Sequence, residues 1–175
     1  MTVTRDRLLV GGLVLALVAA LVAVVLLWRD RDDADARAES SAELVEASVA
    51  AEKEARDVVT RMTTYSFRTV EDDFSWVDDA GTENFQRNFA DASKDAIALI
   101  KTLKATAAGS VVDSSATAAD ADHVKVLLFV DQKIRSQGEK GAKLDQPRIT
   151  MQMVRQGGEW LVDEVTVNSL VSRPR

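Results

Sequence analysis

The sequence contains no cysteine and only one histidine in 175 residues. The absence of cysteine excludes disulfides, thiolate metal sites and cysteine nucleophiles. The sequence also lacks a phosphate-cradling glycine loop, a nucleophile elbow and a paired-histidine metal motif. We therefore expect no enzyme, no cofactor and no bound metal, and we assign no catalytic, cofactor-binding or metal-ligating residue.

The single histidine, His123, admits two interpretations. It forms half of an acid–base pair with Asp122, or it is a surface residue at the edge of a strand. We favour the surface interpretation, which is the commoner one for a lone histidine. The acid pairs Asp72–Asp73 and Asp78–Asp79 lack the spaced oxygen ligands of a calcium loop, so we interpret them as helix caps and solvated turn residues.

Basic residues are in the minority, and the formal net charge is −6. Phosphate binding requires clustered lysine and arginine, so the charge balance argues against a nucleic-acid partner. No run of basic residues follows the longest apolar segment, which also argues against a polybasic patch for lipid headgroups.

One uncharged segment, LLVGGLVLALVAALVAVVLLW, runs from Leu8 to Trp28. As a helix it is about 32 Å long, which matches the apolar core of a bilayer. A cleaved signal peptide is the alternative, but its apolar core is shorter, about 7–15 residues. We therefore predict a transmembrane helix at 8–28 after a cytoplasmic tail at 1–7. Lysine and arginine are nearly balanced across this segment, so their count does not fix its orientation. We place the short tail inside, because this leaves the large acidic domain on the extracytoplasmic side.

After the apolar segment the composition changes to acids, alanine and short polar residues. We interpret residues 29–54 as an acidic linker and stalk helix, because RDRDDADARAESSAE cannot bury a core. A folded domain at 55–170 and a tail at 171–175 follow. An apolar stripe at helical spacing predicts that the stalk helix continues into this domain, through Ala51, Ala55, Val58, Met62 and Tyr65.

Two further helices are predicted in the folded domain. Asp72 or Asp73 caps a short helix, which Gly81 ends. Thr82 caps a longer helix, and an apolar stripe predicts the face that this helix turns toward the core. The stripe consists of Phe85, Phe89, Ala92, Ala96, Leu99 and Leu103.

After Ala105 the apolar pattern changes from helical to alternating, which predicts strands. We predict four of them, in AAGSVVDSSATA, DHVKVLLFVDQKI, RITMQMVR and EWLVDEVTV. A polar loop at 135–147 separates the second strand from the third, and the Gly157–Gly158 turn joins the last two. Helices followed by consecutive antiparallel strands predict an α+β fold, with the helices packed on a curved four-stranded antiparallel sheet.

Several large apolar side chains are candidates for an apolar cavity or a partner face. Leu127 and Phe129 lie on the face of the second strand opposite its core stripe. Either both faces of the sheet are covered, or one of them is kept for a partner. The candidate set is Tyr65, Trp76, Leu127, Phe129 and Trp160, and core packing explains these residues equally well.

The order of these parts resembles that of the Mce-associated membrane proteins of actinobacteria. The resemblance covers roughly residues 55–167 and the anchor, and it rests on three short motifs: Thr64-Tyr65-Ser66-Phe67-Arg68, Val130-Asp131-Gln132 and Trp160-Leu161-Val162-Asp163. It implies an anchored cone of the cystatin-like or nuclear-transport-factor-two-like kind, in which three helices pack on a curved antiparallel sheet. It also implies an accessory role at Mce lipid importers, which move sterols or fatty acids, and no catalytic residue.

We therefore expect a membrane-anchored accessory or scaffold protein that stabilises or organises an Mce-type lipid import complex. The expected partners are Mce transporter subunits and other Mce-associated proteins, and self-association is a further alternative. Two other functions stay open. One is a cone that binds a lipid between helices and sheet. The other is a scaffold subunit of a secretion-type envelope complex, because the same fold serves in type IV secretion scaffolds.

Overall fold

A computed structural model describes residues 39–168 of the protein. The predicted transmembrane segment at 8–28 and the tail at 171–175 lie outside these residues. Between residues 39 and 168, no helix is both long and apolar enough to cross a membrane. The chain divides into two compact units, Met1–Glu43 and Leu44–Arg175, and the described part of the second unit carries the fold.

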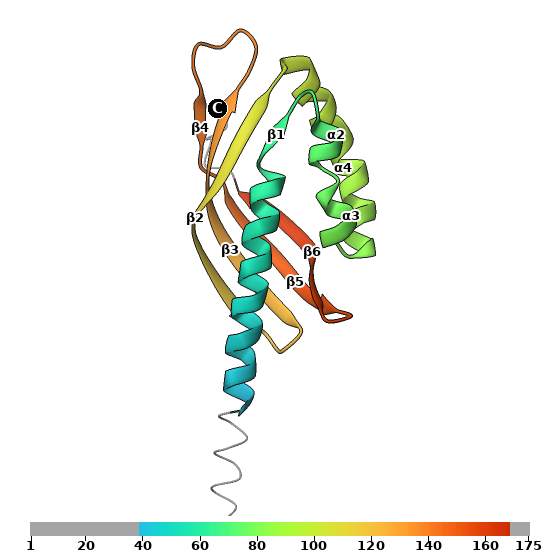
Figure 1. The fold of residues 1–175 in the computed structure, drawn as a ribbon, viewed down its shortest axis with the longest axis vertical. Coiled ribbons are helices and arrows are strands. Elements are labelled where there is room, and N and C mark those ends of the chain that lie inside the picture. Colours follow the sequence, from blue (N-terminus) through green and yellow to red (C-terminus); the bar gives the residue numbers. More distant parts are fainter. Residues whose placement is uncertain (1–38, 169–175) are drawn as a thin grey trace, which may run out of the picture. The chain divides into compact units, whose positions relative to one another are not determined.

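A six-stranded antiparallel sheet forms one layer of this unit, in the order β1-β2-β3-β5-β6 with β4 paired to β3 (Figure 1). Its four long strands confirm the predicted ones: β2 is Thr106–Ala118, β3 is His123–Arg135, β5 is Arg148–Gln156 and β6 is Glu159–Asn168. The predicted number of four strands is wrong. β1 (Tyr65–Ser66) and β4 (Lys143–Asp145) also join the sheet, and both are too short to show an alternating pattern.

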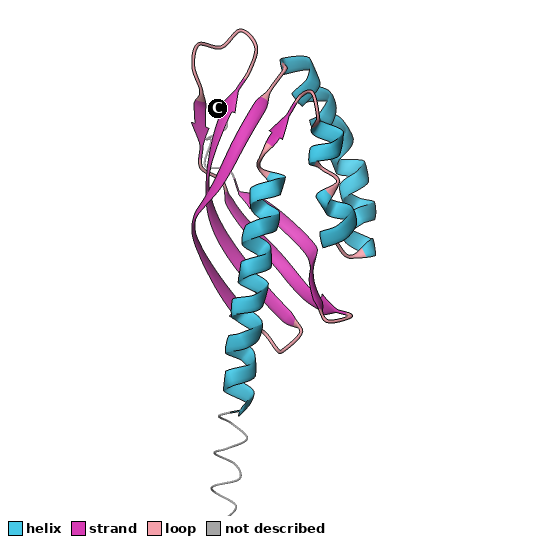
Figure 2. Ribbon diagram, viewed as in Figure 1, coloured by secondary structure: helices cyan, strands magenta, loops and turns pink. Residues whose placement is uncertain are grey.

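The helices cover the inner face of the sheet, and the hydrophobic core lies between the two layers (Figure 2). Alternate side chains of the long strands point into this core, as the alternating pattern predicts. The buried residues of the two central strands are Val124, Val126, Leu128 and Val130 of β3, and Ile149, Met151 and Met153 of β5.

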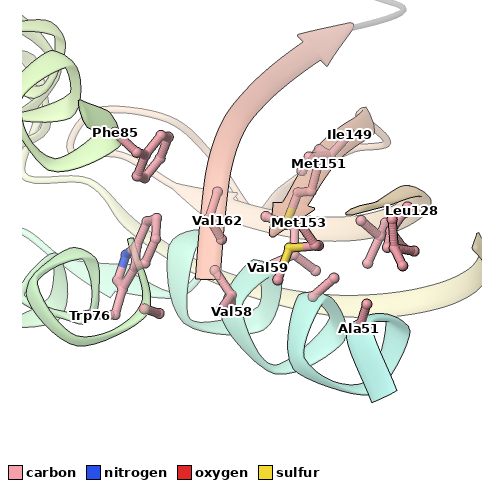
Figure 3. Close-up of a cluster of buried hydrophobic side chains, with 14 of the residues drawn as sticks. Ala51, Val58, Val59, Trp76, Phe85, Leu128, Ile149, Met151, Met153 and Val162 are labelled. Atoms are coloured by element: carbon pink, nitrogen blue, oxygen red, sulfur yellow. The ribbon is translucent and has the colours of Figure 1, made fainter. Parts of the chain in front are cut away.

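The first helix is described over residues 39–62 and packs against the inner face (Figure 3). Ala47, Ala51 and Ala55 recur once per turn and are buried, so the helix can approach the strands closely. Val58 and Val59 then fill the centre of the core. Burial therefore begins at Ala47, ahead of the predicted domain start at residue 55.

The first helix ends at residue 62, so the prediction that it continues through Tyr65 is wrong. The chain turns at Thr63–Thr64, and Tyr65 and Ser66 then pair with Ala107 and Thr106 of β2. Helical spacing continues across this boundary, but backbone pairing with a strand about forty residues away overrides the local pattern.

Thr63 clamps the end of the first helix to the sheet. Its Oγ1 donates a hydrogen bond of 2.6 Å to the carbonyl oxygen of Val59, and its own carbonyl accepts one of 2.9 Å from Nε2 of Gln132. A methyl group on Gly109 of β2 would lie 1.9 Å from Oγ1 of Thr63. Gly109 is therefore required for the close contact between helix end and strand.

We expect Gly109→Ala to destabilise the domain by about 1–3 kcal/mol, because the methyl group pushes Thr63 and the helix end away from β2. Urea denaturation of the purified protein measures this change. The matched control is Ala108→Ser, next to Gly109 on the exposed outer face, with an expected effect within about 0.5 kcal/mol. Equal stability of the two variants would show that the clamp is not needed.

Two short helices, α2 (Val70–Asp73) and α3 (Trp76–Ala80), replace the single short helix predicted here. Asp72 and Asp73 lie at the end of α2, so they are not N-caps. Asp73 instead accepts hydrogen bonds from the backbone N–H of Ser66 at 2.7 Å and from Oγ1 of Thr69 at 3.0 Å. The predicted end at Gly81 is confirmed.

The long helix α4 spans Glu83–Leu103 and begins at the predicted cap, because Thr82 Oγ1 accepts a hydrogen bond of 3.2 Å from the Phe85 N–H. The predicted core stripe is only half right. Phe85 is buried in the main core, but Leu99 and Leu103 are 58% and 43% exposed.

The buried face of α4 rotates along the helix because its two halves contact different clusters. The first half packs on the main core through Phe85 and Phe89, whereas the second half packs through Ile97 and Ile100 on a separate cluster around Val70. Lys101 also forms an ion pair with Glu71 of α2 on this side. The second half of the apolar stripe, Leu99 and Leu103, is consequently left largely exposed.

We expect Ile100→Ala to cost about 2–5 kcal/mol of unfolding free energy, because it leaves a cavity in the second cluster. Its exposed neighbour provides the control: Leu99→Ala should change stability by less than about 0.5 kcal/mol. Thermal or urea unfolding compares the two variants. A larger loss for Leu99→Ala would mean that the helix presents the originally predicted face to the core.

Candidate functional site

The five predicted site residues do not share one cavity. Trp76 is 4% exposed in the main core, with its ring centroid 5.3 Å from that of Phe89. Its Nε1 has no hydrogen-bond partner among the described residues, so the ring contributes packing. Tyr65 belongs to the second cluster, where it meets Phe74 edge-on with centroids 5.9 Å apart.

Trp160 lies on the inner face of β6 at the rim of an open hollow of about 440 Å³. The other walls of this hollow come from the first helix and from α3, and they include Lys53, Glu54, Arg61 and Asp79. Arg61 is held in place by Asp57 at 2.8 Å. Charged side chains contribute much of the lining, and Arg61 also pairs with Glu54 at 3.5 Å, so the hollow does not resemble an apolar ligand pocket.

Leu127 and Phe129 lie on the outer face of the sheet, opposite the core. Each borders a shallow hollow, and the Arg148 guanidinium stands 5.7 Å from the centre of the Phe129 ring. The exposed cations Lys125, Lys133, Arg135 and Arg148 lie on the same face. The outer face is therefore polar and rich in cations, with isolated apolar side chains.

His123 is an exposed residue at the start of β3, as predicted, but its partner is Asp120 and not Asp122. Its Nδ1 lies 2.9 Å from Oδ1 of Asp120. The backbone N–H of Asp122 and the His123 ring both lower the pKa of Asp120. Within residues 39–168, no group of three or more histidine, aspartate or glutamate side chains is arranged to hold a metal ion.

An open groove of about 330 Å³ with largely apolar walls lies between α4 and β6, and we call it the α4–β6 groove. Phe85, Phe89 and Ala92 form the wall on α4, and Val165 and Val167 form the wall on β6. Val165 and Val167 pair with the buried Met151 and Ile149, which places them on the inner face of the sheet. Val167 is nevertheless 55% exposed.

Beside this groove, β6 is an edge strand of the sheet. Along the edge of β6 that faces away from β5, Gly81 forms an isolated bridge with Val162, and the Thr82 N–H donates to the Val162 carbonyl at 2.9 Å. Beyond Val162, no described residue pairs with the backbone on that side. The edge is therefore open from residue 163 to residue 168.

The α4–β6 groove was not predicted, although the sequence pattern contains part of it. The stripe on α4 was recognised and assigned wholly to the core. Which half of the stripe is covered depends on the clusters that the two halves of α4 contact. Helical spacing carries no information about these contacts.

Comparisons with known proteins extend the description of the fold. No protein-family model matches the chain, and no curated protein matches its sequence. Several solved structures match its fold. An IcmL-like type IV secretion system protein from Legionella pneumophila has a TM-score of 0.60 and 5% identity, over 71% of this chain and 94% of that one.

The periplasmic domain of DotI has a TM-score of 0.57 and 13% identity, over 67% of this chain and 91% of that one. CagV, a VirB8 homolog of the type IV secretion system from Helicobacter pylori, has a TM-score of 0.57 and 12% identity, over 70% and 98%. At these identities the likeness shows the fold alone. It confirms the prediction of helices packed on a curved antiparallel sheet.

Tyr65 is the only tyrosine in the chain, so its phenolate can be titrated without interference. Burial and, to a smaller extent, the negative charge of Asp145 raise the pKa of Tyr65 above the ordinary value of 10.0. We expect an ultraviolet titration of the folded protein to place its midpoint above 10.0. Asp145→Asn should lower the midpoint only in part, because burial is the larger cause.

The same shift has a consequence for stability. The folded protein holds the Tyr65 proton more tightly than the unfolded chain. The raised pKa of Tyr65 therefore adds to the free energy of unfolding below pH 10, and this added stability is lost as the pH rises through the folded pKa. Tyr65→Phe should remove this part of the alkaline destabilisation. A midpoint at 10.0 in the folded protein would show that the side chain is freely solvated.

Proposed function

We propose that this protein is a membrane-anchored, non-catalytic scaffold subunit of a multi-subunit envelope complex of the secretion type. The observation that carries the proposal is the fold likeness to three type IV secretion proteins, each matched over at least 91% of its own chain. A fold alone does not define a function, so the chemistry of the chain has to agree with this role.

The side chains of the described residues support a non-catalytic role. The polar groups that are buried serve the fold: Thr63 and Gln132 clamp the first helix, and Thr82 caps α4. His123 faces solvent beside Asp120, and it borders the shallow hollow on the outer face that Leu127 also lines. An interaction subunit needs exposed surfaces and a stable core, and both are present.

The predicted anchor at 8–28 supports a position at the membrane. Among the matched structures, DotI is represented by its periplasmic domain. By analogy we place residues 44–168 on the extracytoplasmic side, with the N-terminus in the cytoplasm. This orientation agrees with the prediction from the sequence, in which the acidic linker holds the domain away from the membrane.

A second candidate function is the accessory role at an Mce-type lipid importer, which the resemblance in sequence motifs favours. The structure gives these motifs places in the fold: Tyr65 and Ser66 form β1, and Gln132 binds Thr63. These roles suit either complex. A lipid held between helices and sheet is less well supported, because large side chains such as Leu128, Met151 and Met153 fill that space.

Cross-linking of the tagged full-length protein in intact cells, followed by purification from solubilised membranes, tests the proposal. We expect envelope-complex subunits of the secretion type to co-purify. Recovery of Mce transporter subunits in their place would favour the second candidate. Recovery of no membrane-complex subunit, together with turnover of a small molecule by the purified protein, would overturn both.

A further inference from the structure

We propose that the α4–β6 groove, together with the open edge of β6, binds an extended segment of a partner protein that carries alternating apolar and basic side chains. The segment adds to the sheet as a strand next to β6. This inference rests on the proposed scaffold function and specifies where and how one partner is held.

The backbone of β6 supplies the first part of the argument. Residues 163–168 pair with β5 on one side only, and an edge strand is a template for another extended chain. Edges that avoid such pairing carry charged side chains, proline or a β-bulge. The bulge of β6 and its two carboxylates lie at Asp163–Glu164, and residues 165–168, VTVN, carry none of these features.

The groove supplies the second part. Successive side chains of a strand point to opposite faces, so every second side chain of an added strand would turn to the inner face. There it meets Phe85, Phe89 and Ala92 of α4, beside Val165 of β6. The hollow of about 330 Å³ between helix and edge is therefore placed to receive apolar side chains.

The apolar surface also continues along α4 beyond the groove. Leu99 and Leu103 extend the stripe of Phe85, Phe89 and Ala92 at helical spacing, and both are largely exposed.

The charges at the groove determine which partner fits. Asp163 lines the groove and accepts a hydrogen bond of 3.0 Å from Thr82 Oγ1. Glu164 pairs with the outward-facing Gln152, so its exposed side chain lies on the outer face, next to the alternate side chains of an added strand that turn outward. No lysine, arginine or histidine lines the groove. A second copy that pairs through its own β6 would bring the same carboxylates together, and an anionic membrane surface would be repelled. A segment with basic side chains is the complementary partner.

The direct test uses the full-length chain in nanodiscs of neutral phosphatidylcholine, with empty nanodiscs as the blank. The probes are two fluorescein-labelled peptides, one alternating valine with arginine and the other alternating valine with glutamate. We expect the arginine peptide to bind at least about tenfold more tightly. Hydrogen exchange should slow in residues 163–168 when it binds, because their open amides become paired.

Charge reversal provides the decisive variant. Glu164→Arg should reverse the preference toward the glutamate peptide. The matched control, Glu139→Arg, changes the net charge equally at an exposed position away from the groove and should keep the preference of the wild type. The proposal is overturned if neither peptide binds, if the control also reverses the preference, or if exchange in residues 163–168 does not change.

Two further outcomes separate this site from its competitors. If the arginine peptide binds only after deletion of residues 169–175, the chain itself covers the edge and the partner assignment is wrong. If envelope subunits still co-purify equally with Glu164→Arg, the scaffold function stands and this site is wrong. Loss of those subunits from this variant but not from the control supports the site.

Discussion

The contact between the first helix and the inner face of the sheet is the constraint on which the rest of the structure depends. Three alanines at one-turn spacing and the paired valines Val58 and Val59 let this helix lie close to the central strands. Thr63 and Gly109 then fix its end against β2. Because this helix occupies the centre of the inner face, α2, α3 and α4 are left to cover the remainder (Figure 1).

This arrangement explains why α4 changes its buried face. Its first half reaches the main core, whereas its second half reaches the separate cluster around Val70. A single straight helix that serves two clusters must leave part of one apolar stripe uncovered. The α4–β6 groove lies along the first half of this helix, where Phe85, Phe89 and Ala92 face Val165 and Val167 of β6.

Charge is distributed unevenly over the sheet. Cations such as Lys125 and Arg148 lie on the outer face of the central strands, whereas the edge strand β6 carries the carboxylates Asp163 and Glu164. Complementary charge favours correct neighbours at such surfaces and repels wrong ones.

The sequence by itself determined the four long strands, the cap and start of α4, the fold class and the surface position of His123, because periodicity and capping depend on neighbouring residues. Only the tertiary structure decided where the first helix stops, that Tyr65 enters a two-residue strand, and which half of the α4 stripe is covered. Each of these depends on contacts between residues far apart in the chain, and such contacts leave no local pattern. The candidate site belongs to this second group, since it consists of a helix face and a strand edge that meet only in the folded chain.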